Sequence, residues 1–76
     1  MVEAYITIQT GAGTTRDVVE QVRTLDSVRR ASIVAGEFDI VAEVEAESER
    51  ELLTLITEEI QDIEGVGRTS TCIVLG

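Results

Sequence analysis

Asp39 is the residue of this sequence whose type and position best suit binding chemistry. It follows Gly36 in a short connection between two β-branched runs, and such a pattern predicts a β-hairpin. We expect Gly36 to adopt a positive φ in a tight turn, which leaves free backbone amides beside the Asp39 carboxylate. A carboxylate and bare amides can hold a charged small molecule. The alternative is a structural turn in which Asp39 only adds solubility, and the turn alone leaves both interpretations open.

The composition excludes several kinds of catalytic and metal site. The 76 residues include no histidine and one cysteine, Cys72. Histidine is the commonest general base and metal ligand, and a CxxC site or a disulfide within the chain needs two cysteines. The glycines of Thr10-Gly11-Ala12-Gly13 lack the Gly-Lys-Ser/Thr of a Walker loop. We therefore predict no catalytic residue, no metal and no cofactor, and we assign Cys72 no chemistry.

The charge balance restricts the partners. Fifteen acidic residues against six arginines give a net charge of -9, which repels nucleic-acid phosphates, so no direct nucleic-acid partner is expected. Such an excess is typical of halophilic proteins and favours a salt-loving, haloarchaeal source, the alternative being an acidic protein of a mesophile. The sequence has no apolar run of about 18 residues and does not begin like a signal peptide. We expect a soluble, cytoplasmic protein with no membrane partner.

Apolar periodicity predicts four strands and two helices in one domain, residues 1–76. The strands are expected at 2–9, 28–34, 38–45 and 66–75. The first helix is expected to start at Thr14 or Thr15 and to close at Asp26-Ser27, and the second to start at the Ser48 and Glu51 capping box and end at Gly65. The predicted buried stripes are Val18, Val19, Val22 and Leu25 in the first helix and Leu52, Leu53, Ile56, Ile60 and Ile63 in the second.

This order, β-α-β-β-α-β, predicts an α+β ferredoxin-like fold. Its antiparallel sheet has the spatial order 4-1-3-2, with both helices on one face. Cys72 is expected under the helices, and the opposite face is expected to carry Tyr5, Thr7, Val34, Val41, Thr71 and Ile73. Because no helix remains to cover that half-apolar face, we expect a sheet-to-sheet homodimer. Arg29 and Arg30 are interpreted as guards of an edge strand, or alternatively as contacts to an acidic partner or a ligand carboxylate.

Two motifs, Gly36-Glu37-Phe38-Asp39 and Gly65-Val66-Gly67-Arg68-Thr69-Ser70-Thr71, resemble the RAM domain, the amino-acid-sensing domain of the Lrp/AsnC transcriptional regulators. The resemblance covers essentially the whole chain. It implies dimers joined through their sheets, higher assemblies such as rings of dimers, and an amino acid or related metabolite bound between subunits. It also implies that Gly36, Asp39, Thr69 and Thr71 contact the ligand.

The sequence departs from complete regulators because its first strand starts at Val2, where they carry a helix-turn-helix domain. We therefore expect a stand-alone RAM module that serves transcription regulation without its own DNA-binding domain. Assembly with full-length Lrp/AsnC regulators as an adaptor is compatible with that role. The alternatives are an ACT-type amino-acid-binding module and a small enzyme of the dimeric ferredoxin-like barrel type. We also expect Asp39 and Thr69 at opposite ends of the sheet, which would require two subunits to build one site.

Overall fold

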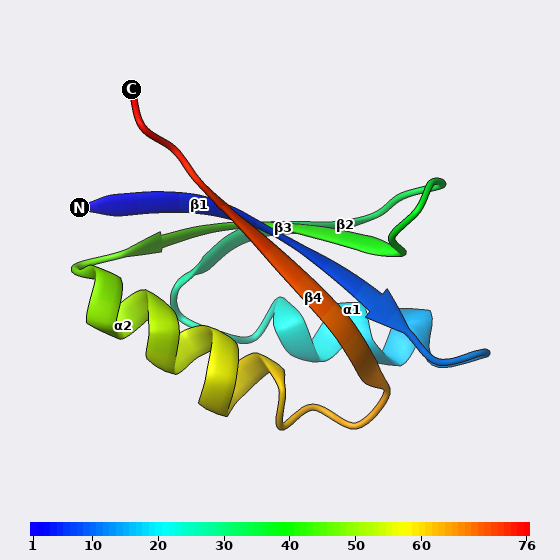
Figure 1. The fold of residues 1–76 in the computed structure, drawn as a ribbon. Helices are drawn as coiled ribbons and strands as arrows, with labels where there is room; N and C mark the ends of the chain where they lie inside the picture. Colours follow the sequence, from blue (N-terminus) through cyan, green and yellow to red (C-terminus); the bar gives the residue numbers. More distant parts are fainter.

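Two helical segments cover one face of a four-stranded antiparallel sheet in the computed structural model, which describes all 76 residues (Figure 1). The strands are β1 (Val2–Thr10), β2 (Val28–Ile33), β3 (Ile40–Ala46) and β4 (Val66–Ile73). Their spatial order is β2-β3-β1-β4, so β2 and β4 are the edge strands. The helices are α1 (Thr15–Val22) and α2 (Glu49–Thr54), and α2 continues as the π-helix η1 (Leu55–Ile60). The predicted ferredoxin-like fold and strand order are confirmed.

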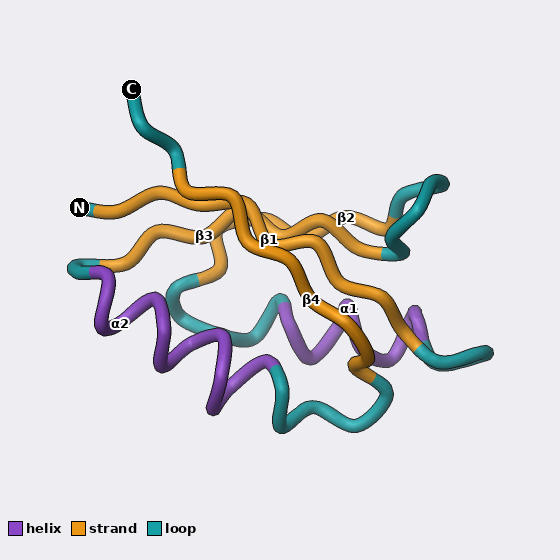
Figure 2. The backbone as a smooth tube through the Cα atoms, in the orientation of Figure 1, coloured by secondary structure: helices purple, strands orange, loops and turns teal.

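The core lies between the sheet and this helical layer (Figure 2). All 14 buried residues are apolar. The two central strands supply half of them by strict alternation, because every second side chain of a strand points to the same face. These seven residues are Ala4, Ile6, Ile8, Ile40, Ala42, Val44 and Ala46.

Helix α1 buries the predicted residues Val18, Val19 and Val22, whose spacing places them on one helical face. The helix ends at Val22, before the predicted stop at Asp26-Ser27. After that end, the Arg23 side chain donates from Nε to the Ala31 carbonyl at 3.0 Å, which ties the end of α1 to β2. Leu25 lies in the following turn and packs partly buried against the core.

The second helix begins as predicted and turns most of its predicted stripe to the core, but it ends at Ile60, before the predicted stop at Gly65. Ser48 Oγ accepts a hydrogen bond from the Glu51 amide at 3.2 Å. From Leu55 onward the helix is a π-helix, whose i→i+5 hydrogen bonding brings residues five apart onto one face, as with Leu55 and Ile60. Both are fully buried, whereas Leu53, predicted in the buried stripe, is 60% exposed. None of the helical segments is long and apolar enough to cross a membrane.

Strand β4 contains a bulge that reverses the predicted orientation of its side chains. Ile8 pairs with Thr69, but Thr10 pairs with Val66, so β4 has one more residue than β1 in this stretch. The extra residue shifts the alternation by one position. Thr71 and Ile73 therefore pair with the core residues Ile6 and Ala4 and face the helical layer. The prediction that Thr71 and Ile73 lie on the opposite face was wrong.

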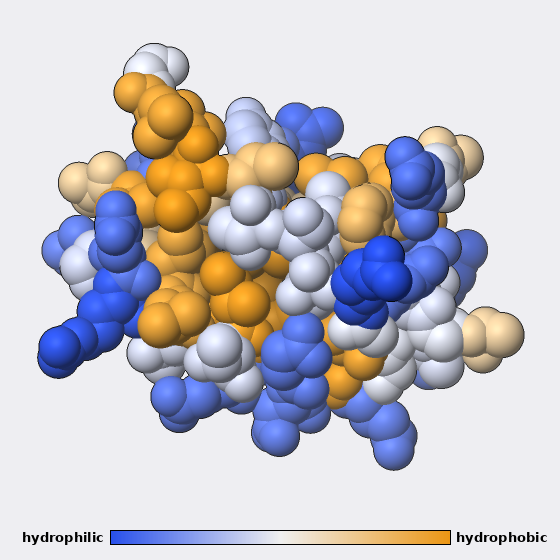
Figure 3. Space-filling view, viewed as in Figure 1, coloured by the Kyte–Doolittle hydropathy of each residue, from blue (hydrophilic) through white to orange (hydrophobic).

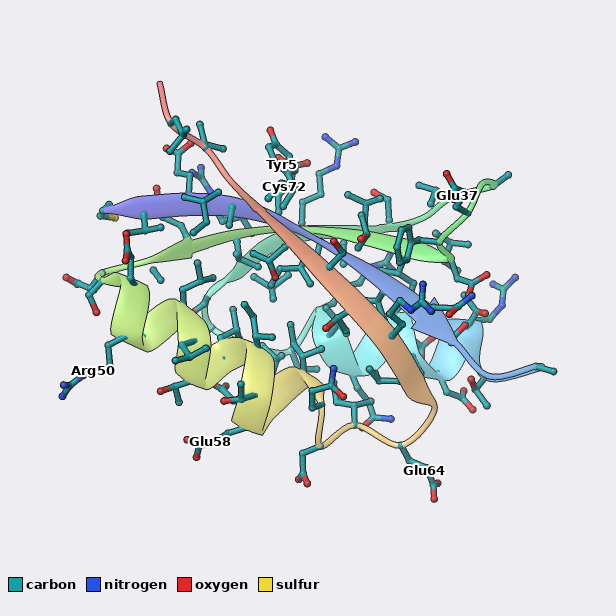
Figure 4. All side chains as sticks on the ribbon, in the orientation of Figure 1. Tyr5, Glu37, Arg50, Glu58, Glu64 and Cys72 are labelled. Atoms are coloured by element: carbon teal, nitrogen blue, oxygen red, sulfur yellow. The ribbon has the colours of Figure 1, made fainter.

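Cys72 lies on the other side of β4. It pairs directly with Tyr5 and is exposed, so the prediction of a buried Cys72 was also wrong. Tyr5 and Cys72 lie together on the side of the sheet away from the helices (Figure 4). The thiol is accessible in the isolated chain.

Candidate functional site

The hairpin between β2 and β3 carries the predicted site residues Gly36 and Asp39, and its connection is longer than a tight turn. Residues 34–39 form a loop that the Val34 amide closes by donating to the Asp39 carbonyl at 2.8 Å. The prediction of a positive φ at Gly36 was wrong, because only Gly13 and Gly65 have one. A six-residue loop reverses the chain without that conformation. Val34, predicted on the open side of the sheet, instead follows the end of β2 and belongs to this loop.

Asp39 is held at the end of β1. Its Oδ2 accepts hydrogen bonds from the Thr10 amide at 2.8 Å and from Thr10 Oγ1 at 3.2 Å, and its own amide donates to the Ile8 carbonyl at 3.0 Å. Thr10 Oγ1 lies 2.6 Å from Oγ1 of Thr15, the first residue of α1. The half-buried Asp39 is therefore anchored through one carboxylate oxygen, and Oδ1 has no hydrogen-bond partner within the chain.

Thr69 and Thr71 face the helical layer from β4. Thr69 Oγ1 accepts a hydrogen bond from Gln61 Nε2 at 3.1 Å, just beyond the end of η1. Thr71 lines an apolar groove of about 400 Å³ between α2 and β4, together with Leu53 and Ile73. This groove is visible as hydrophobic surface between the two elements (Figure 3).

Asp39 and Thr69 lie at the same end of the sheet, which corrects the prediction that they lie at opposite ends. Ile8 pairs with Ile40 on one side and with Thr69 on the other. Because β3 and β4 are both antiparallel to β1, they run parallel to each other, and both begin where β1 ends. Asp39 and Thr69 are thus separated by two interstrand spacings, about 10 Å. The fold no longer requires a second subunit to bring these two residues near each other.

The four predicted site residues nevertheless do not share one cavity in the single chain. Gly36 is exposed in the hairpin loop, and Asp39 lines neither the groove beside Thr71 nor a second hollow, on the other face of the sheet. Three contributing residues were not identified from the sequence: Thr10 binds the Asp39 side chain, Gln61 binds the Thr69 side chain, and Thr15 contacts Thr10. Thr10 and Thr15 flank the two glycines that close β1, and that position was the only indication in the sequence.

No element of this chain covers the face of the sheet away from the helices, here called the open face. Its residues include Glu3, Tyr5, Thr7, Arg30, Val41, Glu43, Ser70 and Cys72. A hollow of about 310 Å³ lies on its polar side. There Arg29 pairs with Glu45 at 3.3 Å and Arg30 with Glu43 at 3.9 Å, both from the edge strand β2 to β3. The predicted edge position of the two arginines is confirmed.

Comparisons with protein-family models and with known sequences both relate this chain to transcriptional regulators. The family model of the Lrp/AsnC ligand binding domain matches residues 3–76. An uncharacterized HTH-type transcriptional regulator of Pyrococcus furiosus is 37% identical over 60 residues, which are 79% of this chain and 40% of the regulator. The chain thus spans about 40% of the length of the curated relatives that it matches.

Solved structures extend the similarity to the whole fold. The crystal structure of FFRP-DM1 superposes with a TM-score of 0.94 at 36% identity, covering 99% of this chain and all of that one. The feast or famine regulatory protein of M. tuberculosis, complexed with L-methionine, has a TM-score of 0.86 at 26% identity, and the match covers all of this chain and 51% of that one. The chain belongs to the Lrp/AsnC ligand-binding domain family, a family of transcriptional regulators.

Proposed function

We propose that this chain senses free amino acids for transcription regulation and oligomerises in doing so. Family membership and the L-methionine complex of the M. tuberculosis relative support an α-amino acid as the ligand. The observation that carries the proposal is the state of Asp39. One carboxylate oxygen is fixed by Thr10, and the other is left for a cation such as the ligand's ammonium group.

The remaining predicted residues have complementary chemistry. Backbone amides around Gly36 suit the ligand's carboxylate, and the hydroxyls of Thr69 and Thr71 suit its carboxylate or a polar side chain. Because these groups do not meet in one cavity, we propose that the site is completed when subunits assemble. The proposed assembly contains sheet-to-sheet dimers and rings of dimers, and mixed assembly with full-length regulators is compatible with it.

The distribution of charge supports the open face as the dimer interface. Glu3, Glu43 and Glu45 are opposed there by Arg29 and Arg30, so this face carries a net charge of -1 of the total of -9. The helical layer and the loops carry the rest. Two copies meet with the least electrostatic repulsion through the open face, where Tyr5 and Val41 supply apolar area.

Calorimetry on Asp39→Asn tests the binding function. The substitution keeps the shape of the side chain and removes its charge, so it should weaken binding of L-methionine by about 1.5–3 kcal/mol, the usual range for a hydrogen bond to a charged group. Glu37→Gln is the matched control, because it removes an exposed charge from the same loop. Size-exclusion chromatography should show unchanged assembly for both variants. Equal affinities of Asp39→Asn and wild type would reduce Asp39 to a structural residue.

We also expect this chain to have no affinity of its own for duplex DNA. A net charge of -9 opposes the phosphate contacts that supply most non-specific binding. An electrophoretic mobility shift assay at low salt is the most sensitive test, since non-specific binding is strongest there. A shift at micromolar protein concentration would contradict the expectation.

A further inference from the structure

Thr10 lies where three segments of the candidate site meet. Its backbone pairs with Val66 at the start of β4, its amide and hydroxyl both bind Asp39 Oδ2, and its hydroxyl contacts Thr15 at the start of α1. We propose that Thr10 is a positioning residue of the amino-acid site, which orients Asp39 for the ligand. The inference rests on the proposed function of Asp39.

The directions of the hydrogen bonds explain how Thr10 fixes the carboxylate. The Thr10 amide can only donate, and the ionised Asp39 carboxylate can only accept. With its hydrogen directed at Asp39, the Thr10 hydroxyl must accept from Thr15, since either hydroxyl can be the donor in that 2.6 Å contact. The resulting series of hydroxyl hydrogen bonds runs from Thr15 through Thr10 to Asp39. The amide and the hydroxyl of Thr10 thus both donate to Asp39 Oδ2, which leaves Oδ1 as the oxygen for a ligand.

This arrangement lowers the cost of binding a ligand. A side chain that is already held in its bound orientation loses less conformational freedom when the ligand arrives. Without the hydroxyl of Thr10, a single amide would hold Asp39, and the carboxylate could rotate about that one contact. The contribution of Thr10 to affinity therefore acts entirely through Asp39.

The same segment also fixes the other half of the candidate site. The Gly11 amide donates to the Gly65 carbonyl at 2.9 Å, and Thr10 pairs with Val66. These contacts hold the beginning of β4 three residues before Thr69. The end of β1 thus sets the distance between Asp39 and Thr69. These backbone contacts remain when only the Thr10 hydroxyl is removed.

Three variants test the inference on the full chain. Thr10→Val removes the hydroxyl and keeps the amide, Thr10→Ser keeps both, and Thr14→Val removes a different hydroxyl contact in the same loop, the 2.8 Å bond to the Gly11 carbonyl. The twenty standard L-amino acids are first screened by thermal shift on the wild type. The tightest ligand is then measured by calorimetry.

We expect Thr10→Val to raise the Kd about 10-fold, with Thr10→Ser and Thr14→Val within about 2-fold of wild type, because only the first loses a hydrogen bond to a charged group. Thr10→Val added to Asp39→Asn should cause no further loss, since Thr10 acts through Asp39. A purely structural role would instead lower the Tm and add to the effect of Asp39→Asn.

The outcomes separate the inference from the proposed function. A wild type that binds none of the twenty amino acids would overturn both. A wild type that binds, together with a weakened Asp39→Asn and an unaffected Thr10→Val, would overturn the positioning role alone. Additive effects of Thr10→Val and Asp39→Asn on the Kd would also overturn the positioning role alone.

Discussion

Replacing Gly65 with alanine is expected to lower the free energy of unfolding by about 2–5 kcal/mol. Gly65 lies in the turn between η1 and β4 with a φ of +101°, a conformation that disfavours any residue with a Cβ. A Cβ added there would also lie 2.9 Å from Thr14 Oγ1 and 2.9 Å from Val18 Cγ2. Val18 is fully buried and has no room to move aside. Strain in the backbone and overpacking in the core therefore act together.

Two other glycines separate these contributions. Gly13 has a φ of +80°, and an added Cβ would meet no atom within 4 Å, so Gly13→Ala should cost only the backbone strain, about 1–2 kcal/mol. Gly36 has neither feature, and Gly36→Ala should be nearly neutral. Equilibrium denaturation by urea at one fixed protein concentration measures all three. If Gly65→Ala is no less stable than Gly13→Ala, close packing at Gly65 contributes nothing.

The central strands show why much of this fold could be predicted from the sequence. Residues of β1 and β3 alternate because one side of each strand packs on helices and the other does not, and hydrogen bonding on both edges keeps them regular. The Ser48 cap is a local signal that does not depend on distant contacts. Element order and strand order followed from such features.

The errors about which way side chains face arose where the backbone departs from a regular period. At Gly67 an added Cβ would lie 3.1 Å from the Gln9 carbonyl oxygen, so glycine permits a close approach at the bulge that reverses the faces of Thr71 and Cys72. A glycine within a strand is a known sign of a bulge, but it does not give the direction of the shift. The π-helix left no comparable sign, and an assumed α-helical period misplaced Leu53.

The candidate site was predictable only in part. Asp39 could be identified because a carboxylate beside a loop is a local pattern. Its contact with Thr10 joins residues 29 positions apart, and its existence depends on β1 ending beside the start of β3. Sequence periodicity carries no information on such a side-chain contact. The hydrogen bonds from Thr10 to Asp39 could therefore be identified only in the folded structure.

Val41→Glu is expected to convert the proposed dimer into monomers. Val41 lies at the centre of the open face, paired with Thr7 on one side and Ser32 on the other. In a two-fold symmetric dimer the substitution places two unpaired carboxylates in the interface, and burying an ion costs several kcal/mol. The dissociation constant should therefore rise by about 1,000-fold or more. Leu53→Glu, which changes an exposed apolar residue on α2, is the control and should leave the dimer intact.

Cys72 provides an independent measurement of the same interface. Its thiol is exposed on the open face of the single chain, so a sheet-to-sheet dimer should protect it and Val41→Glu should expose it. Thiol labelling should be slow in wild type and in Leu53→Glu, and fast in Val41→Glu, while sedimentation velocity reports the mass of each species. Far-UV circular dichroism identifies a folded monomer, because labelling of an unfolded chain would also be fast. A wild-type dimer with a rapidly labelled Cys72, or a Val41→Glu protein that remains dimeric, would show that the subunits meet through another surface.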